Sequence, residues 1–162
     1  MNRAFIAVGT LLFLALCCCG PYSPFASMLT IEKPDSVNVI GLYELTGQNL
    51  NRSEPFQNRH PQILINEDGS CQVIDFPVWQ TNDEISYSVK EWLSFSGTWG
   101  MSEMGSVEKG DGTYKNWGIG CGNNEEKLNV TGELINDKPP YGILFIYGDP
   151  DSGHGMDFGK VP

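Results

Sequence analysis

Side chains typical of catalysis are scarce in this sequence. Its 162 residues include only two histidines. His60 stands before a proline and His154 stands between two glycines, so both are expected in loops. There is no Gly-x-Ser-x-Gly motif of the kind that presents a nucleophilic serine on a sharp turn. The 20 acidic residues offer many carboxylate pairs, but no pair stands out. The sequence therefore predicts a protein that is not an enzyme and that holds no metal or cofactor.

Basic residues are also few. Lysine and arginine number 10 against 20 acidic residues, and the formal net charge is −10. A surface with this charge repels phosphate backbones, which excludes a nucleic-acid partner. The acidic residues are scattered along the chain, as on a solvated surface, although one dominant sign of charge also suits a basic protein partner.

Long hydrophobic runs are missing as well. The longest begins at Ala4 and ends at Leu16, and its 13 residues are too few for a membrane-spanning helix. This length, after the single charge of Arg3, is typical of a secretory signal. We expect residues 1–18 to be a signal peptide, because Pro21 and Pro24 would stop any helix that continued. The alternative is an uncleaved anchor from Ala4 to Ile31, since no charge appears before Glu32.

Three of the five cysteines follow this run directly. A cysteine in this place resembles the bacterial lipoprotein signal, which has an aliphatic residue three positions earlier and a small residue immediately before. Cys19 fits best, and Cys17 is the next choice. Its palmitate-type acyl chains would hold the protein to a membrane of the cell envelope. Gly20, rather than an aspartate, follows Cys19, which favours the outer membrane in a two-membrane cell.

The other two cysteines are Cys71 and Cys121. In an exported protein an isolated pair of this kind is expected to form a disulfide. The alternative is two separate buried thiols, because cysteine also serves as a small core residue. A bridge requires the strand that begins at Ser70 to lie beside the end of the strand that contains Trp117.

Residues 19–35 are rich in proline, serine and small side chains and are predicted to form a tether. From residue 36 to 162 apolar residues recur mostly at every second position, which indicates β-strands. One example runs through Leu93, Phe95, Gly97, Trp99 and Met101. Asp68-Gly69 supplies a hairpin turn. About eight such strands predict an all-β domain, a single antiparallel barrel or a sandwich.

Two segments leave alternatives open. In residues 82–92, "NDEISYSVKEW", Ile85, Val89 and Trp92 stand at helical spacing, so a short helix and a continued strand are both possible. In residues 148–157, "GDPDSGHGMD", the first acidic residues resemble a calcium loop. Gly153 replaces the third of them and no glutamate closes the loop, so a chain-reversing turn is favoured.

Several stretches are similar to a group of uncharacterised bacterial lipoproteins with small lipocalin-like barrel domains. They are "VIGLYELTG", "LINEDGSCQVIDFP", "SFSGTWG" and "PPYGILFIYGDPDSGHGMDFGKV", which cover most of residues 37–161. The resemblance implies export, lipid anchoring and a barrel, and it implies no known activity.

The tryptophans carry the functional hypothesis. Trp92, Trp99 and Trp117, together with Tyr43, are expected either to fill the barrel core or to line its mouth. In the second case they would bind a small apolar or glycan ligand. The competing hypothesis is a protein-interaction or inhibitor module of the envelope that uses an acidic face and a filled barrel.

Overall fold

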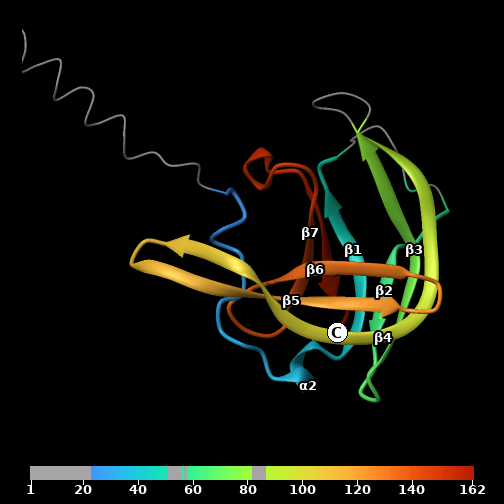
Figure 1. Ribbon diagram of the computed structural model, residues 1–162, viewed down its shortest axis with the longest axis horizontal. Coiled ribbons are helices and arrows are strands. Elements are labelled where there is room, and N and C mark those ends of the chain that lie inside the picture. Colours follow the sequence, from blue (N-terminus) through green and yellow to red (C-terminus); the bar gives the residue numbers. More distant parts are fainter. Residues whose placement is uncertain (1–22, 51–55, 57, 82–86) are drawn as a thin grey trace, which may run out of the picture.

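The described part of the chain contains eight antiparallel strands (Figure 1). The structure is a computed structural model that describes residues 23–50, 56, 58–81 and 87–162. Cys17 and Cys19 lie outside the described residues. The elements are α2 (Ser36–Val39), β1 (Gly41–Gln48), β2 (Gln62–Ile65), β3 (Ser70–Thr81), β4 (Tyr87–Lys109), β5 (Gly112–Asn123), β6 (Leu128–Ile135), β7 (Gly142–Ile146), the 3-10 turn η1 (Pro150–Ser152) and β8 (Gly155–Lys160).

The strands close into a barrel in sequence order. Each strand pairs with its neighbours along the chain, and β8 pairs with β1 through Tyr43↔Lys160 and Leu45↔Phe158. This last ladder distinguishes a barrel from a sandwich, because a sandwich would leave two sheets with free edges. The prediction of an all-β antiparallel barrel is confirmed, and the sandwich alternative is wrong.

The predicted alternation produces the core. Along β4, Leu93, Phe95, Trp99 and Met101 pack in or against the core, while the side chains between them are exposed. The alternation that begins at residue 36, with Val37 and Val39 two positions apart, predicted a strand there, but the first strand starts only at Gly41. Ser36–Val39 instead form the single helical turn α2, which leaves Val37 70 % exposed and closes one end of the barrel.

The Asp68-Gly69 turn forms as predicted. It joins β2 to β3, and Gly69 has a φ of 85°, which a residue without Cβ adopts at low cost. The amide of Ser70 donates to the Asp68 carboxylate, and the amide of Asn66 donates to the Ser70 carbonyl. The open segment 82–92 is strand from Tyr87 onward, and residues 82–86 lie outside the described part.

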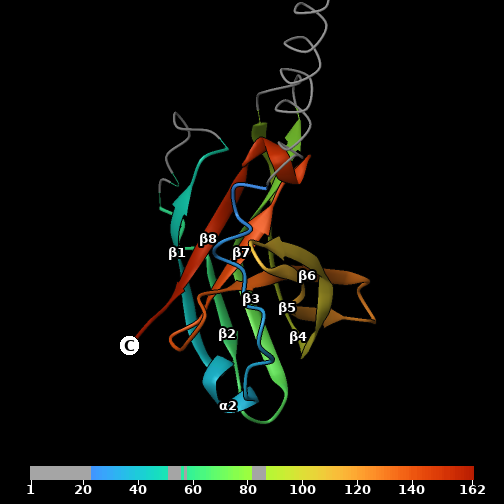
Figure 2. The same ribbon diagram turned by 90° about the vertical axis from the view of Figure 1, so that its left-hand side faces the viewer.

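The stretch expected to be a tether includes a segment that packs against the barrel. Residues 23–31, here named the strap, run down the outside of the barrel from η1 towards α2 (Figure 2). Ala26 and Leu29 are buried at 3 % and 6 % exposure. They pack in one cluster with Ile135 of β6 and Leu144 of β7. The strap therefore covers the outer face of β7, which explains why that strand is apolar on both faces.

The strap also adds backbone hydrogen bonds to the barrel wall. The amide of Thr30 donates to Leu134, and the amide of Trp117 donates to Thr30. Thr30 therefore bridges β5 and β6 where their own ladder has ended at Gly118↔Glu133.

In the described part of the chain, no helix is long and apolar enough to cross a membrane.

Candidate functional site

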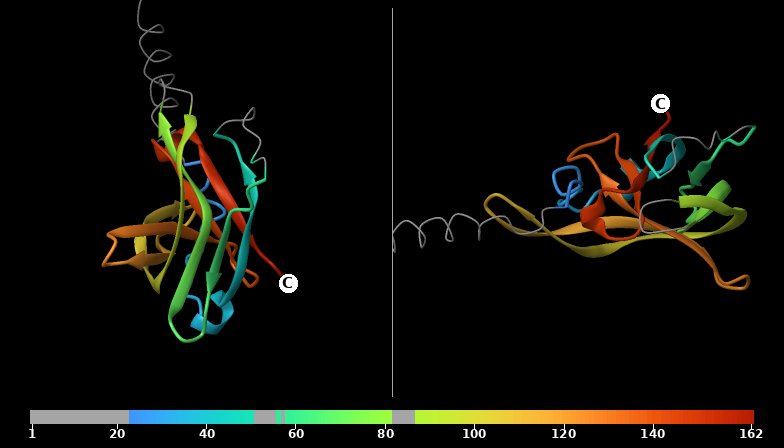
Figure 3. Two further views of the ribbon diagram at one scale, coloured as in Figure 1. Left: turned by 90° about the vertical axis from the view of Figure 1, so that its right-hand side faces the viewer. Right: turned by 90° about the horizontal axis from the view of Figure 1, so that it is seen from above.

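The barrel wall splits on one side, between β4 and β6. β4 pairs with β3 over most of its first half, but its ladder with β5 begins only at Thr98. β6 pairs with β7 only from Glu133 to Ile135. Among the described residues, 91–93 and 95–97 of β4 and 128–132 of β6 therefore have a ladder partner on one side only. The β5–β6 hairpin projects away from the barrel at this place (Figure 3).

A groove of about 440 Å³ occupies this split. Its lining comes from β3, β4, β6, β7 and the residue after β7, and most of its side chains are apolar. They are Phe76, Val78, Glu91, Leu93, Leu128, Asn129, Val130, Thr131, Phe145, Ile146 and Tyr147. Phe76 and Phe145 are buried and pack edge to face, with ring centroids 4.9 Å apart. The volume lies within the range of small-molecule sites.

Tyr147 supplies a polar group to this apolar lining. Its hydroxyl forms no hydrogen bond with any described residue, and burial raises the pKa of the phenol above its usual value. The phenol therefore stays protonated at neutral pH and can donate a hydrogen bond to a ligand. Its backbone amide donates to the carbonyl of His154, which closes the loop between β7 and β8 beside the groove.

None of the four predicted ligand-lining residues lines this groove. Tyr43 is fully buried in the barrel, and its hydroxyl donates to the Val39 carbonyl at 2.7 Å. The Trp99 indole donates to the Asn66 carbonyl at the β2–β3 turn. Both side chains thus hold the end of the barrel that α2 closes.

The other two aromatics lie elsewhere again. Trp117 lies under the Lys33 ammonium, 5.2 Å from its ring centroid. Trp92 packs against Phe56 and beneath the Arg59 guanidinium. The structure therefore does not bring the four residues together into one site.

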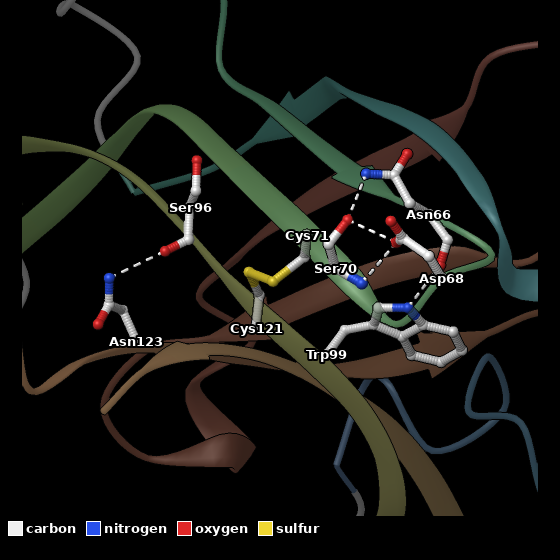
Figure 4. Close-up of a disulfide and its surroundings, with 8 residues drawn as sticks. All are labelled: Asn66, Asp68, Ser70, Cys71, Ser96, Trp99, Cys121 and Asn123. Atoms are coloured by element: carbon white, nitrogen blue, oxygen red, sulfur yellow. Dashed lines mark hydrogen bonds between the residues drawn. A yellow bond between two sulfur atoms is a disulfide. The ribbon is translucent and has the colours of Figure 1, made fainter. Parts of the chain in front are cut away.

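A disulfide joins β3 to β5 (Figure 4) beside the start of the β4–β5 ladder at Thr98, a place here named the foot of the split. Cys71 of β3 and Cys121 of β5 are joined, with Cα atoms 6.1 Å apart and both side chains buried. They flank β4, where Cys71 pairs with Gly97 and Cys121 pairs with Trp99. The bridge thus fixes β5 against β3 near Thr98, where the β4–β5 ladder begins.

No known protein family, no curated protein and no solved structure matches this chain. The functional conclusion therefore depends on the geometry of the groove.

Metal-ligating side chains do not gather in the described part of the chain, where no group of three histidine, cysteine or acidic residues could hold an ion. The "GDPDSG" segment is a turn that contains η1. The Asp149 carboxylate accepts the amide of Asp151, and Gly153 has a φ of 71°. The carboxylate of Asp149 therefore serves to form the turn by accepting a backbone hydrogen bond.

One partly buried carboxyl group with a perturbed pKa lies outside the groove. Glu133 of β6 accepts a hydrogen bond from the Asn116 amide at 2.9 Å, while its other oxygen is buried without a partner in the described structure. Burial raises the pKa of Glu133, and the Asn116 hydrogen bond opposes this effect. Perturbed acids often mark active sites. Glu133 is hydrogen-bonded to the side-chain amide of Asn116, which precedes the strap contact at Trp117, so we interpret Glu133 as a residue that stabilises the β5–β6 pair.

Glu133→Gln is expected to stabilise the protein slightly at neutral pH, by less than about 1 kcal/mol, because solvent screens a partly exposed carboxylate and the amide oxygen can still accept the Asn116 hydrogen bond. A carboxyl whose pKa is raised by folding loses stability as the pH rises from its unfolded pKa through its folded pKa. The gain from glutamine should therefore be present at pH 7 and vanish at about pH 4, near the ordinary pKa of glutamate. Thermal melts at both pH values test this. Glu108→Gln is the control, because Glu108 is exposed. A gain that is equal at both pH values would contradict the assignment.

Proposed function

We propose that the protein is a non-catalytic, lipid-anchored binding module of the bacterial cell envelope, and that the groove between β4 and β6 binds a small apolar ligand. The observation that carries this proposal is the groove itself. Its lining combines buried phenylalanines and aliphatic side chains with the phenol of Tyr147 and with three polar residues, Glu91, Asn129 and Thr131. A glycan is less suited, because the half-buried tryptophans, whose ring faces could stack on a sugar, do not line the groove.

Anchoring at Cys19, with Cys17 as the next choice, and location in the envelope are part of the same proposal. They are supported by the short apolar segment before the cysteines. An outer-membrane location in a two-membrane cell is supported by Gly20.

A protein-interaction module is the second candidate. The largest core residues, including Tyr43, Phe158 and Met156, are fully buried, which is what a filled barrel requires. The one-sided strand edges of β4 and β6 could also pair with an extended peptide. This candidate predicts that the groove does not take up a small apolar probe.

Leu128→Gln is expected to weaken binding of N-phenyl-1-naphthylamine, an apolar fluorescent probe, by about tenfold. A half-buried apolar side chain that lines the groove is replaced by an amide that must be desolvated when the probe binds. The measurement is probe fluorescence with the chain from residue 19 onward. Cys19→Ser removes the acylation site and leaves every described residue in place.

Met101→Gln is the matched control. Met101 is also a half-buried residue packed against the core, but it does not line the groove. It should lose similar stability and retain probe affinity. Equal affinity in the Leu128 variant and the parent protein would refute the ligand site, and absence of probe binding in the parent would favour the protein-interaction module.

A further inference from the structure

The first residues of the strap pack against the β7–β8 loop, which borders the groove. The Ser23 hydroxyl donates to the Pro150 carbonyl at 3.4 Å. A Cβ atom added at Gly153 would lie 3.0 Å from the Pro24 side chain, so Pro24 packs directly on this loop. Tyr147, which lines the groove, precedes the same loop. The start of the described chain, the β7–β8 loop and one end of the groove therefore lie together.

The rest of the strap is held firmly. The amide of Asn136 donates to Met28, and the Lys109 ammonium donates to Leu29 at 3.1 Å. The Thr30 side chain is completely buried and donates to the Asn136 carbonyl at 2.7 Å. Together with the apolar cluster around Leu29, these contacts fix the position of Ser23 relative to the barrel.

This attachment limits how far the barrel can lie from its anchor. Cys19 is four residues before Ser23, and four residues span at most about 14 Å. An acyl group on Cys19 therefore brings the β7–β8 loop close to the bilayer. Because α2 and the β2–β3 turn lie at the opposite end of the barrel, that end points away from the membrane (Figure 2).

We propose that the groove takes the acyl chain of a membrane lipid, which enters at the Tyr147 end that the strap holds against the bilayer. The inference rests on the proposed function and names its ligand. An acyl chain suits the mostly apolar lining, and the Tyr147 hydroxyl, which has no hydrogen-bond partner among the described residues, can donate to an ester or carboxylate oxygen. The β7–β8 loop carries the exposed residues Asp149 and Asp151, so the anchor rather than surface charge supplies the membrane contact.

The orientation is tested with the acylated protein in phosphatidylcholine vesicles that contain a headgroup nitroxide lipid. Palmitate labelling that is lost in Cys19→Ser first establishes the anchor. A fluorophore is then attached at Asp151→Cys or at Glu67→Cys, two exposed turn residues at opposite ends of the barrel. We expect quenching of the probe at position 151 and no quenching at position 67. Equal quenching at both positions would overturn the orientation.

The ligand is tested in vesicles whose phosphatidylcholine carries a photoreactive group in its acyl chain. After illumination, cross-links are expected in the peptides that contain residues 128–131 and 145–147. Leu128→Gln should reduce them about tenfold and Met101→Gln should not. Cross-links spread evenly over the barrel surface would overturn the proposal.

Two further outcomes separate the lipid assignment from the proposed function. Suppose the Cys19→Ser protein binds N-phenyl-1-naphthylamine but the acylated protein in vesicles gives no groove cross-links. The groove then binds apolar ligands, and the membrane-lipid assignment is wrong. If the acylated protein excludes the probe in detergent while Cys19→Ser admits it, the protein's own acyl chain is the occupant, which also overturns the proposal. Failure of probe binding in both forms refutes the proposed function itself.

Discussion

Reduction of the Cys71–Cys121 disulfide is expected to lower the free energy of unfolding by about 4 kcal/mol. The two cysteines are 50 residues apart in sequence, and opening a loop of that size restores chain entropy to the unfolded state. This loss is a large part of the roughly 5–15 kcal/mol that holds a typical domain together. Both sulfur-bearing side chains are buried, so reduction in the folded state should be slow without denaturant.

Urea unfolding with and without a phosphine reductant measures the effect. The double variant Cys71→Ala and Cys121→Ala is the control, because the reductant has no bond to break in it. Its midpoint should lie below that of the oxidised parent and should not move on reduction. A parent midpoint that is the same with and without the reductant would contradict the prediction.

Reduction of the disulfide should also weaken probe binding in the groove. The bridge fixes β5 beside β3 where β4 and β5 separate, so its loss frees the β5–β6 hairpin that carries Leu128 and Val130. We expect weaker probe binding in the reduced protein than in the oxidised protein at urea concentrations where both remain folded.

Local patterns were sufficient to predict the strands. The alternation from Leu93 to Met101 and the Asp68-Gly69 turn each depend on residues adjacent in sequence. The number of such strands left a barrel and a sandwich open, because closure depends on the ladder between β1 and β8, which lie at opposite ends of the domain sequence. The helical turn at Ser36–Val39 was missed because Val37 and Val39 also satisfy a strand pattern.

The strap could not be predicted in the same way. Its proline-rich and small residues are typical of a linker, and its hydrogen bonds go to Leu134, Asn136 and Trp117, more than 80 residues away. Those backbone groups are available only because the β5–β6 ladder ends at Gly118↔Glu133. The one local signal was β7, whose apolar residues on both faces required a cover on the outside of the barrel.

The site was missed for a related reason. The groove arises where ladders stop, and the place at which a ladder stops depends on twist and bulges rather than on residue type. Sequence reasoning favoured tryptophans because they are large and often bind ligands. Here Trp99 instead holds a turn, and Trp117 lies beneath Lys33. The sequence feature that could have indicated the groove was Tyr147, a phenol directly after the apolar strand β7.

Gly97→Ala is expected to destabilise the protein by about 3 kcal/mol, because a side chain at this position has no room. A Cβ atom at Gly97 would overlap the carbonyl group of Gly122 in β5. Backbone atoms of a paired strand cannot move aside as a flexible side chain can. The end of β5 must therefore shift away from β4, at the place where the disulfide already constrains it.

Gly100→Ala is the matched control for this variant. Gly100 lies three residues further along β4, and a Cβ atom there meets nothing within 4 Å. Alanine at that position should be neutral or stabilise the protein by up to about 1 kcal/mol, since it reduces the entropy of the unfolded chain. Urea unfolding of both variants gives the comparison, and equal midpoints would show that β4 and β5 are not in close contact at Gly97.

The Gly97 variant also tests whether the groove depends on this contact. Gly97 and Gly122 meet at the foot of the split, so a shift of Gly122 should widen the groove beside it. Probe affinity should therefore fall in Gly97→Ala and stay unchanged in Gly100→Ala, both measured in the absence of urea. If Gly97→Ala were destabilised and yet bound the probe as tightly as the parent, the β4–β5 contact would be a requirement of the fold and not of the groove.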